Sequence, residues 1–489
     1  MNNIIDQENQ KTSRSDEALS FEQFLERVKP CQDVIEQLVS VGGKDDFKAR
    51  LYYCDGLIDS TLYHSNLLPM LERWEDTSVA SESEAGRILH PNWLFMKLDA
   101  GKPDHIFARL FAGSVIVIFE DDPYFYEYNI ANQPARSPEE STMELSLKGP
   151  RDGFVEQLSV NVALVRKRLR TPNLHVENFK IGSESQTEIT LMHMADQAPP
   201  GLLDEVRRRI RSIDIPMLNG AGQLEELISD RPISLFPLLE YIGRPDYVAQ
   251  SLMKGRFAIL VDGSPAAIIG PGNLLLLIKS PEDAHLPFYF VTAERLLRIL
   301  GLFLSLFLPG FWIAISSFNT DQIPFTLLAT VTMSRIGLPM SATMEMFLML
   351  TLFEVFREAG VRLPRPVGQT VSVVGGLIIG DAAIRAGLTS PTMLVVAAVS
   401  AVSTFTLVNQ SLAGAVSIIR FGVLILASIF GVFGFFVGMY AIVVYLCSLE
   451  SFGQHYLQPV APFHVKDVVS ALIQKPWKIA STARRRKRP

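Results

Sequence analysis

A run of 29 residues without a charged side chain constrains this fold more than any other feature: FGVLILASIFGVFGFFVGMYAIVVYLCSL, residues 421 to 449. The hydrocarbon core of a bilayer is spanned by about 20 apolar residues in a helix. The run is therefore predicted to form one transmembrane helix, long enough to tilt. Gly434 and Gly438 stand four residues apart within it, a spacing that lets helix backbones approach closely in lipid.

Three further segments are predicted to cross the membrane: residues 299 to 318, 367 to 384 and 393 to 408. Residues 323 to 356 are also apolar, but Arg335 and the Gly-Leu-Pro sequence at 337 to 339 interrupt them. Such interruptions are tolerated at membrane depth where the backbone is buried in protein or lines a cavity. This region is predicted to be re-entrant or strongly bent, and we expect four to six spans in total.

Charge divides the chain into two parts. From residue 291 onward it carries 16 Lys and Arg against 8 Asp and Glu, whereas the part before carries 29 against 43. The first 20 residues are polar and lack the apolar core of a signal peptide, so the acidic part is expected in the cytosol. The arginines at 357 to 366 and 484 to 488 place that loop and the tail in the cytosol as well, with residues 319 to 322 outside.

The acidic part contains an internal repeat. Residues 110 to 123 (LFAGSVIVIFEDDP) align without a gap with residues 252 to 265 (LMKGRFAILVDGSP), and residues 49 to 59 parallel residues 189 to 199. Repeats of this kind predict two related subdomains in which helices and strands form mixed layers.

The expected fold class is therefore α+β joined to an α-helical membrane domain: two related α/β subdomains, then a polytopic helical domain. The predicted parts are a flexible acidic N-terminus (1–40), a first α/β subdomain (41–145), a second (146–290), a transmembrane domain (291–449) and a basic cytosolic tail (450–489).

Between the two halves of the repeat, a helix rich in cations is predicted. Asp152 is placed to cap it, and four cations crowd its end: Arg166, Lys167, Arg168 and Arg170. Two interpretations stay open, a solvated face or a contact with another subunit or an anionic membrane.

The three cysteines, Cys31, Cys54 and Cys447, form no paired motif and are expected to be free and buried.

Motifs for chemistry are not found. The sequence has no P-loop, no HExxH, no Cys/His cluster at metal spacing and no Gly-x-Ser-x-Gly elbow. We expect no enzyme, no metal and no cofactor. The basic tail at 484 to 488 is better explained by anionic membrane lipid than by nucleic acid.

Carboxylates in or beside the apolar segments are the candidate functional groups, because ionisable side chains are costly in a membrane and usually face a bundle interior or water. These are Glu345, Glu354 and Asp381, with Arg362 and Arg365 in a Pro-Arg turn as coupling residues. Rings of carboxylates favour cations, so neutralising Glu345 or Glu354 is expected to lower cation conductance and leave assembly intact. The alternative is structural pairing: Asp381 with Arg385, and Glu354 with Arg357 or Arg362.

The residues predicted to let the membrane helices pack closely are glycines: Gly375, Gly376, Gly380, Gly434 and Gly438.

Several motifs in succession resemble the GerA family of spore germination proteins, the A subunits of nutrient germinant receptors. They are GPRDGFVEQLSVNVALVRKRLR, GRPDYV, GRFAILVDGSP, REAGVRLPRPVGQTVSVVGGLIIGDAAIRAGLTSP and SFGQHYLQPVAP. The resemblance covers about residues 145 to 462 and extends more weakly back to residue 45. One departure is SFGQHYLQP, where the family more often has Ser-Phe-Gly-Val-Pro-Tyr.

The resemblance implies a multi-pass protein of the spore inner membrane whose soluble region is cytosolic. It also implies a transporter-like B subunit and a lipoprotein C subunit as partners, and self-association into a homo-oligomeric, germinant-gated cation channel. A sister branch, the A-like protein encoded with the dipicolinate-channel genes, fits the same motifs. Two other classes stay open: a secondary transporter with its site at broken helices, and a non-conducting scaffold.

Overall fold

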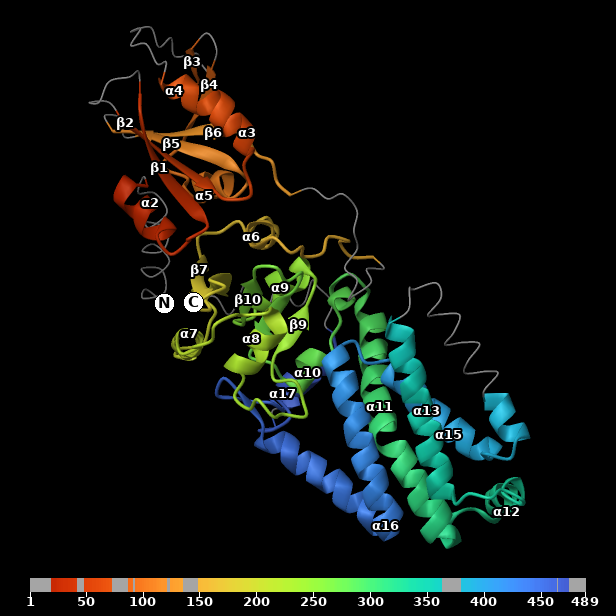
Figure 1. Cartoon of the computed structure of the whole chain (residues 1–489). Helices are drawn as coiled ribbons and strands as arrows, with labels where there is room; N and C mark the ends of the chain where they lie inside the picture. Colours follow the sequence, from red (N-terminus) through yellow and green to blue (C-terminus); the bar gives the residue numbers. More distant parts are fainter. Residues whose placement is uncertain are drawn as a thin grey trace. The chain divides into compact units, whose positions relative to one another are not determined.

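The computed structural model describes residues 19–41, 48–72, 87–90, 93–120, 124–134, 148–362, 380–463 and 465–474. These residues form two compact units (Figure 1). The sheet unit comprises Met1–Ser229 and Tyr241–Pro271, and the helical unit comprises Asp230–Glu240 and Gly272–Pro489. Residues 230–240 and 272–290, which the sequence places with the second subdomain, thus lie in the helical unit.

The first sheet of the sheet unit has six strands in the order β1-β2-β5-β6-β4-β3. Its strands are β1 (Val34–Ser40), β2 (Lys48–Cys54), β3 (Arg87–His90), β4 (Trp93–Leu98), β5 (Ser114–Phe119) and β6 (Phe125–Asn129). Its helices are α2 (Phe21–Val28), α3 (Ser60–Leu62), α4 (Leu68–Glu72) and α5 (Pro103–Leu110), with a π-helical turn, η1 (Tyr63–Leu67), between α3 and α4.

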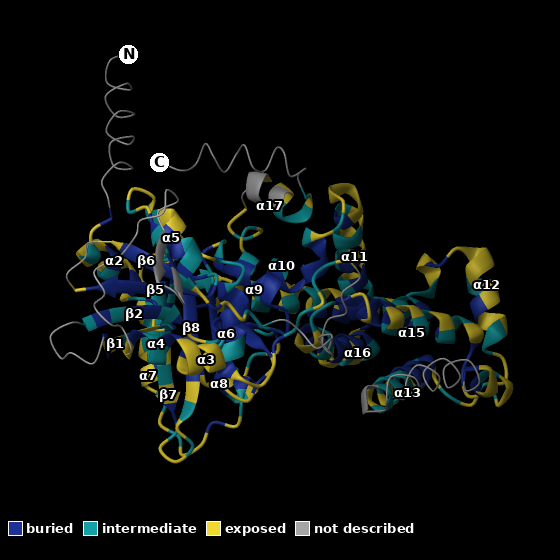
Figure 2. Ribbon diagram, turned by 90° about the horizontal axis from the view of Figure 1, so that it is seen from above, coloured by how far each residue is buried: buried dark blue, intermediate teal, exposed yellow. Residues whose placement is uncertain are grey.

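Both faces of this sheet are covered. Ile116 and Ile118 of β5 pack in one core with Phe24 of α2, while Val115 and Val117 pack in the other core. Since successive side chains of a strand point to opposite faces, a strand covered on both faces is apolar throughout. This explains the continuous apolar sequence SVIVIF, which is buried along its whole length (Figure 2).

The second sheet has five strands in the order β7-β8-β10-β11-β9, which corresponds to β1-β2-β5-β6-β4 of the first sheet. Its strands are β7 (Leu174–Ile181), β8 (Thr187–Met194), β9 (Glu240–Ile242), β10 (Phe257–Val261) and β11 (Ala267–Gly270). Its helices are α6 (Leu158–Arg166), α7 (Leu202–Arg211), α8 (Ala221–Ile228) and α9 (Pro245–Leu252). In each sheet a helix, α5 or α9, leads into a central strand, β5 or β10.

The glycine shared by the two halves of the repeat has the same backbone role in each. Gly113 (φ 100°) follows α5 and Gly255 (φ 81°) follows α9. A Cβ atom on Gly113 would lie 2.3 Å from the Leu57 carbonyl oxygen, and one on Gly255 would lie 2.4 Å from that of Gln197. Only glycine fits a left-handed turn pressed against another backbone segment, and the two carbonyls follow the equivalent strands β2 and β8.

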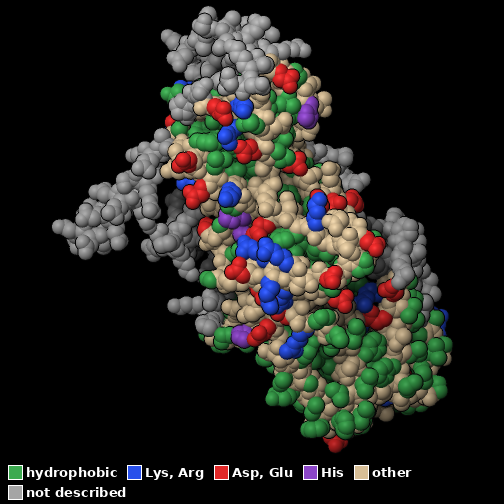
Figure 3. All heavy atoms as spheres, turned by 60° about the vertical axis from the view of Figure 1, so that its left-hand side comes forward, with side chains coloured by type: hydrophobic (Ala, Val, Ile, Leu, Met, Phe, Trp, Pro, Cys, Tyr) green, Lys and Arg blue, Asp and Glu red, His purple; other side chains and the backbone are tan. Residues whose placement is uncertain are grey.

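Among the described residues of the helical unit, the long helices are α11 (Phe288–Ile313), α12 (Phe325–Ser334), α13 (Ala342–Arg362), α15 (Pro391–Thr404) and α16 (Gln410–Ser448). Shorter elements are α10 (Leu274–Leu277), the 3-10 turns η2 (Pro281–Ala284) and η4 (Thr320–Gln322), the π-helical turn η3 (Ala314–Phe318) that continues α11, the strands β12 (Glu450–Ser451) and β13 (Gln454–His455), and α17 (Val465–Leu472). Hydrophobic side chains gather on the surface of this unit (Figure 3).

Two helices of the described residues are long and apolar enough to cross a membrane, Phe288–Phe318 and Gln410–Ser448. The apolar helices α12 and α15 are shorter, and the predicted span at 367 to 384 lies mostly outside the described residues. The predicted interruption at 337 to 339 is present: α12 ends before Arg335, Gly337 has a φ of 88°, and α13 begins at Ala342.

The apolar run at 421 to 449 does not form the single straight helix that was predicted. α16 is broken at Gly431, whose φ of 61° and ψ of −139° are not helical. The chain folds back there, because a Cβ atom on Gly434 would lie 2.0 Å from the Leu426 carbonyl oxygen. α16 is therefore a hairpin with a first arm at 410–430 and a second arm at 432–448, and Figure 1 shows the two arms diverging from a common tip.

Candidate functional site

Both candidate glutamates of α13, Glu345 and Glu354, are held by ion pairs. Glu345 is fully buried, and its Oε1 lies 3.4 Å from Nε of Arg335, at the end of α12. Its Oε2 accepts a hydrogen bond of 3.1 Å from the backbone N–H of Ser390, the residue that caps α15. Glu345 therefore joins the ends of three helices.

Glu354 lies nine residues further along α13 and pairs with two arginines. Arg357, one turn later on the same helix, places Nη2 2.7 Å from Oε2 of Glu354. The guanidinium of Arg420, from the first arm of α16, donates from Nη2 to Oε1. Arg357 also donates from Nη1 to Oγ of Ser417 at 2.9 Å. These contacts tie α13 to the first arm of α16.

Arg420 extends these contacts to α15 and α11. Its side chain is 1% exposed, and Nη1 donates to Oγ of Ser400 on α15 at 3.3 Å. The Ser400 hydroxyl in turn donates to the carbonyl oxygen of Ser305 on α11 at 3.1 Å. Pro309 has no N–H for the carbonyl four residues before it, so the proline frees the Ser305 carbonyl for this bond.

We call the group formed by Glu354, Arg357, Arg420, Ser400, Ser417 and the Ser305 carbonyl the polar network. It joins four helices through groups that are mostly buried among apolar side chains. Its formal charge is +1, from two guanidiniums and one carboxylate. The network can hold helices together and bias their relative positions, but it is not a set of free carboxylates facing a pore.

The structural pairing considered from sequence is thus present for Glu354. Two ion-pair partners were missed, Arg420 of Glu354 and Arg335 of Glu345. Arg420 immediately precedes the uncharged run and carried no local sign of its role. Two features of the sequence could have suggested this role: Arg420 is a lone arginine between apolar segments, and serines stand at 400 and 417. Glu354 pairs with Arg357, as considered, and with Arg420.

Among the described residues, the predicted site residue Asp381 does not join the network. Asp381 pairs with Arg385 at 2.8 Å, and both side chains are exposed. Arg365, Gly375, Gly376 and the side chain of Arg362 lie outside the described residues.

Glycines that pack closely against other segments include three that were predicted from sequence and two that were not. A Cβ atom on Gly380 would lie 3.3 Å from a methyl carbon of Leu394, and Gly434 and Gly438 face the first arm of α16. Two glycines that the sequence analysis did not select also pack closely against other helical segments: a Cβ atom on Gly301 would lie 2.1 Å from Oγ1 of Thr406, and one on Gly310 would lie 2.9 Å from Val423.

The cations at the end of α6 are not a free basic surface. Arg166 is fully buried, and its Nε and Nη2 donate to Asp33 at 2.7 and 2.6 Å. Arg168 donates from Nη2 to both carboxylate oxygens of Asp152. Asp152 therefore holds Arg168 rather than capping α6, whose N-cap is Gln157. Arg166 is therefore not available for a contact with another subunit or with a membrane, and Arg168 is engaged by Asp152.

Two of the three cysteines belong to the same buried region. Cys54 donates its Sγ–H to Oδ2 of Asp33 at 3.2 Å, and Cys31 donates to the Leu174 carbonyl oxygen at 3.4 Å. Burial raises the pKa of Cys31 to about 11 and that of Cys54 well above its ordinary value. Cys447 is exposed, so the expectation that all three are buried is wrong for that residue.

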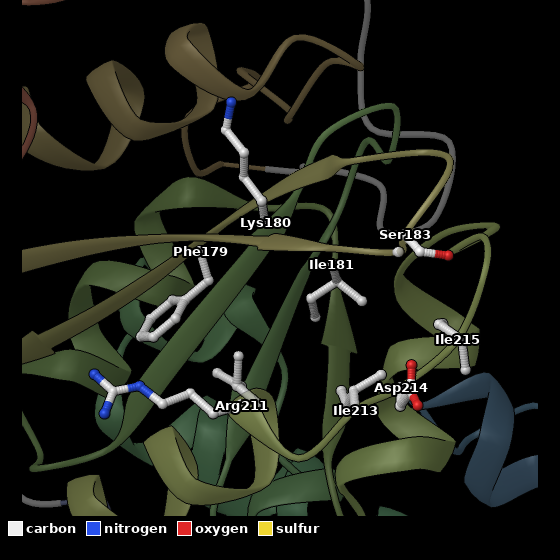
Figure 4. A pocket seen from close by; sticks show the side chains of 10 residues that line it. Phe179, Lys180, Ile181, Ser183, Arg211, Ile213, Asp214 and Ile215 are labelled. Atoms are coloured by element: carbon white, nitrogen blue, oxygen red, sulfur yellow. The ribbon is translucent and has the colours of Figure 1, made fainter.

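A pocket of about 360 Å³ lies in the sheet unit between the end of β7 and the segment after α7 (Figure 4). Phe179 and Ile181 line it from β7, and Arg211, Ile213 and Ile215 line it from the opposite side. Polar and apolar groups line it in similar measure, and its charged members are Lys180, Arg211 and Asp214. Among the described residues no group of three or more His, Cys, Asp or Glu could hold a metal ion.

Fold and site together define a class of protein: a duplicated α+β unit followed by an apolar helical unit with a buried ionic network and two helices of membrane-spanning length. The chain belongs to the Bacillus/Clostridium GerA spore germination protein family, whose model matches residues 22–487. This confirms the resemblance that the sequence motifs indicated.

Curated relatives agree with the family assignment. The chain is 41% identical to spore germination protein XA of Bacillus anthracis over 89% of this chain and 84% of that protein. It is 35% identical to spore germination protein KA of Bacillus subtilis, over 94% and 84%. It is 34% identical to the uncharacterized membrane protein YfkQ of the same species, over 91% and 86%.

One solved structure is also similar, the N-terminal domain of the A subunit of the Bacillus megaterium spore germinant receptor GerK3. It has 25% sequence identity and a TM-score of 0.38, over 52% of this chain and 95% of that one.

Proposed function

We propose that this protein is the membrane-embedded A subunit of a spore germinant receptor, located in the spore inner membrane with its sheet unit in the cytosol. Copies of it associate into a germinant-gated cation channel, in complex with a transporter-like B subunit and a lipoprotein C subunit. The family and the names of the relatives support the role in germination. The name of YfkQ and the two helices of spanning length support the membrane location.

The polar network is the observation that carries the channel proposal. Ionisable groups inside an apolar helix bundle are costly and usually mark an ion path or a switching element. Arg420 reaches Glu354 on α13 and Ser400 on α15, and Ser400 reaches α11. A shift of any one helix therefore disturbs an ion pair or a hydrogen bond of the network, which is what a gate requires.

The hairpin of α16 supports a topology with both ends of the membrane domain in the cytosol. At about 1.5 Å per residue its arms span roughly 31 and 25 Å, against a hydrocarbon core of about 30 Å. Its tip packs on the end of the first spanning helix, because a Cβ atom on Gly431 would lie 2.8 Å from Cβ of Phe318. The first arm then runs outward beside α11, and the second arm returns the chain to the side of the membrane on which α11 begins.

Cysteine labelling tests this topology. Cysteines placed at Asn319 and Phe430, each in a Cys447→Ser background, are expected to react with an impermeant maleimide from outside. Cys447 in the wild type, at the other end of the second arm, is expected to react only from the cytosolic side. In a straight single span residue 430 would lie at mid-membrane, so an unreactive Phe430→Cys variant would contradict the hairpin topology.

Ion flux in liposomes tests the channel proposal against the alternatives. The chain reconstituted with its receptor subunits is expected to pass monovalent cations when a nutrient germinant is added. Uptake of the nutrient coupled to an ion, without conductance, would favour a secondary transporter. Stable assembly with neither flux nor uptake would favour a scaffold.

A further inference from the structure

Helix α17 (Val465–Leu472) presents an apolar stripe to the exterior. Val465, Val469 and Ile473 follow one another at intervals of four residues, which places them on one face of a helix. Their side chains are 60%, 43% and 47% exposed. Among the described residues of the helical unit nothing covers this stripe.

Hydrogen bonds fasten α17 to the first turns of α11. Arg295 donates from Nη1 to the carbonyl oxygen of Ala471 and from Nη2 to Oε1 of Gln474, each at 3.2 Å. The backbone N–H of Gln474 donates to Oγ1 of Thr292 at 3.2 Å. Arg295 is itself held by Asp283, whose Oδ2 lies 2.8 Å from its Nε. The stripe therefore has a fixed position beside the start of α11.

The start of α11 has the composition of a membrane boundary. Phe288, Tyr289 and Phe290 are all exposed there, at 42%, 66% and 48%. Aromatic side chains are enriched where a spanning helix meets the headgroups. The sequence after α17 adds Lys475, Lys478 and the basic run at 484 to 488, with no acidic residue. Clusters of Lys and Arg next to a membrane helix are attracted to anionic lipid.

We propose that α17 is an interfacial helix that lies in the plane of the membrane, with Val465, Val469 and Ile473 immersed in the lipid surface on the cytosolic side. The inference rests on the proposed function in one respect, that α11 crosses a membrane. A lipid surface suits the stripe better than a protein partner does, because three side chains are far fewer than the 20 to 30 residues a side, roughly, of a stable protein interface. The positive chain that follows complements anionic headgroups.

Site-directed spin labelling of the full chain in vesicles of phosphatidylcholine and phosphatidylglycerol tests this proposal. A nitroxide is attached at Val465→Cys or Val469→Cys in a Cys447→Ser background; Cys31 and Cys54 are buried. Collision rates with oxygen, which concentrates in lipid, and with a water-soluble nickel chelate are compared. Two reference sites are Val437→Cys on the exposed face of the second arm of α16 and Leu62→Cys on α3 of the sheet unit.

We expect the nickel collision rate at Val465→Cys and Val469→Cys to be several-fold lower than at Leu62→Cys, with a higher oxygen rate. If the nitroxide at Val465→Cys or Val469→Cys is as accessible to nickel as that at Leu62→Cys, the proposal of an interfacial helix is overturned. Low accessibility to both reagents, with an immobilised spectrum, would also overturn it, because a protein partner would then cover the stripe. Failure of the proposed membrane location is distinguishable, since Val437→Cys would then also be accessible to nickel.

Discussion

Replacing Glu354 by glutamine is expected to destabilise the helical unit and not merely to change ion preference. The substitution leaves the guanidinium of Arg420, 1% exposed, without its carboxylate partner on α13. Removing one partner of a buried ion pair costs about 3–5 kcal/mol, and we expect the lower end because Glu354 is partly exposed. In a unit of this size that corresponds to a drop in Tm on the order of 10 °C. Thermal unfolding of the detergent-purified protein measures it.

Two matched variants show whether the buried charge is the cause. The double variant Glu354→Gln/Arg420→Met removes both charges and is expected to recover most of the lost Tm, because the uncompensated guanidinium is gone. Asp381→Asn breaks an ion pair whose side chains are 58% and 79% exposed, and little change is expected. A Glu354→Gln protein with wild-type Tm and reduced cation flux would instead restore the interpretation of Glu354 as a pore-lining carboxylate.

Replacing Asp33 by asparagine is expected to open the buried region that joins the two sheets. Arg166 donates two hydrogen bonds to Asp33, and both side chains are at most 5% exposed. Loss of the carboxylate is expected to cost about 3–5 kcal/mol, since the guanidinium is left buried and unpaired. Local opening then becomes frequent enough to be detected by a chemical probe.

Thiol reactivity reports this opening. At about pH 8 an ordinary thiol, with a pKa near 8.5, reacts readily. Burial raises the pKa of Cys31 to about 11 and raises that of Cys54, so both stay protonated and shielded in the wild type. In the wild type only Cys447 is expected to react. In the Asp33→Asn variant all three cysteines are expected to react. The control is Glu36→Gln on β1, an exposed ion-pair partner of Arg50. Protected thiols in Asp33→Asn would show that the pair is not needed to hold the sheets together.

The sequence predicted those parts of the fold that depend on local composition. The glycine and apolar pattern shared by residues 110–123 and 252–265 indicated a repeat, and the structure places these residues at equivalent positions in two sheets of the same order. Apolar runs indicated helices of spanning length in the second half, and the described residues contain two such stretches, α11 with its π-helical end and the hairpin α16. Each of these features follows from neighbouring residues, so it can be recognised without knowing the rest of the chain.

The tertiary structure decided which charges meet and where the apolar helix reverses. Arg420 and Glu354 are 66 positions apart, and Arg166 and Asp33 are 133 apart. No local pattern identifies such partners, because their proximity results from how whole elements pack. Gly431 looks like its neighbouring glycines in sequence, yet it alone among the residues of α16 leaves the helical conformation. Its nearest neighbours outside α16 are Phe318 and Asn319, more than 100 positions earlier, which only the folded chain brings to the tip of the hairpin.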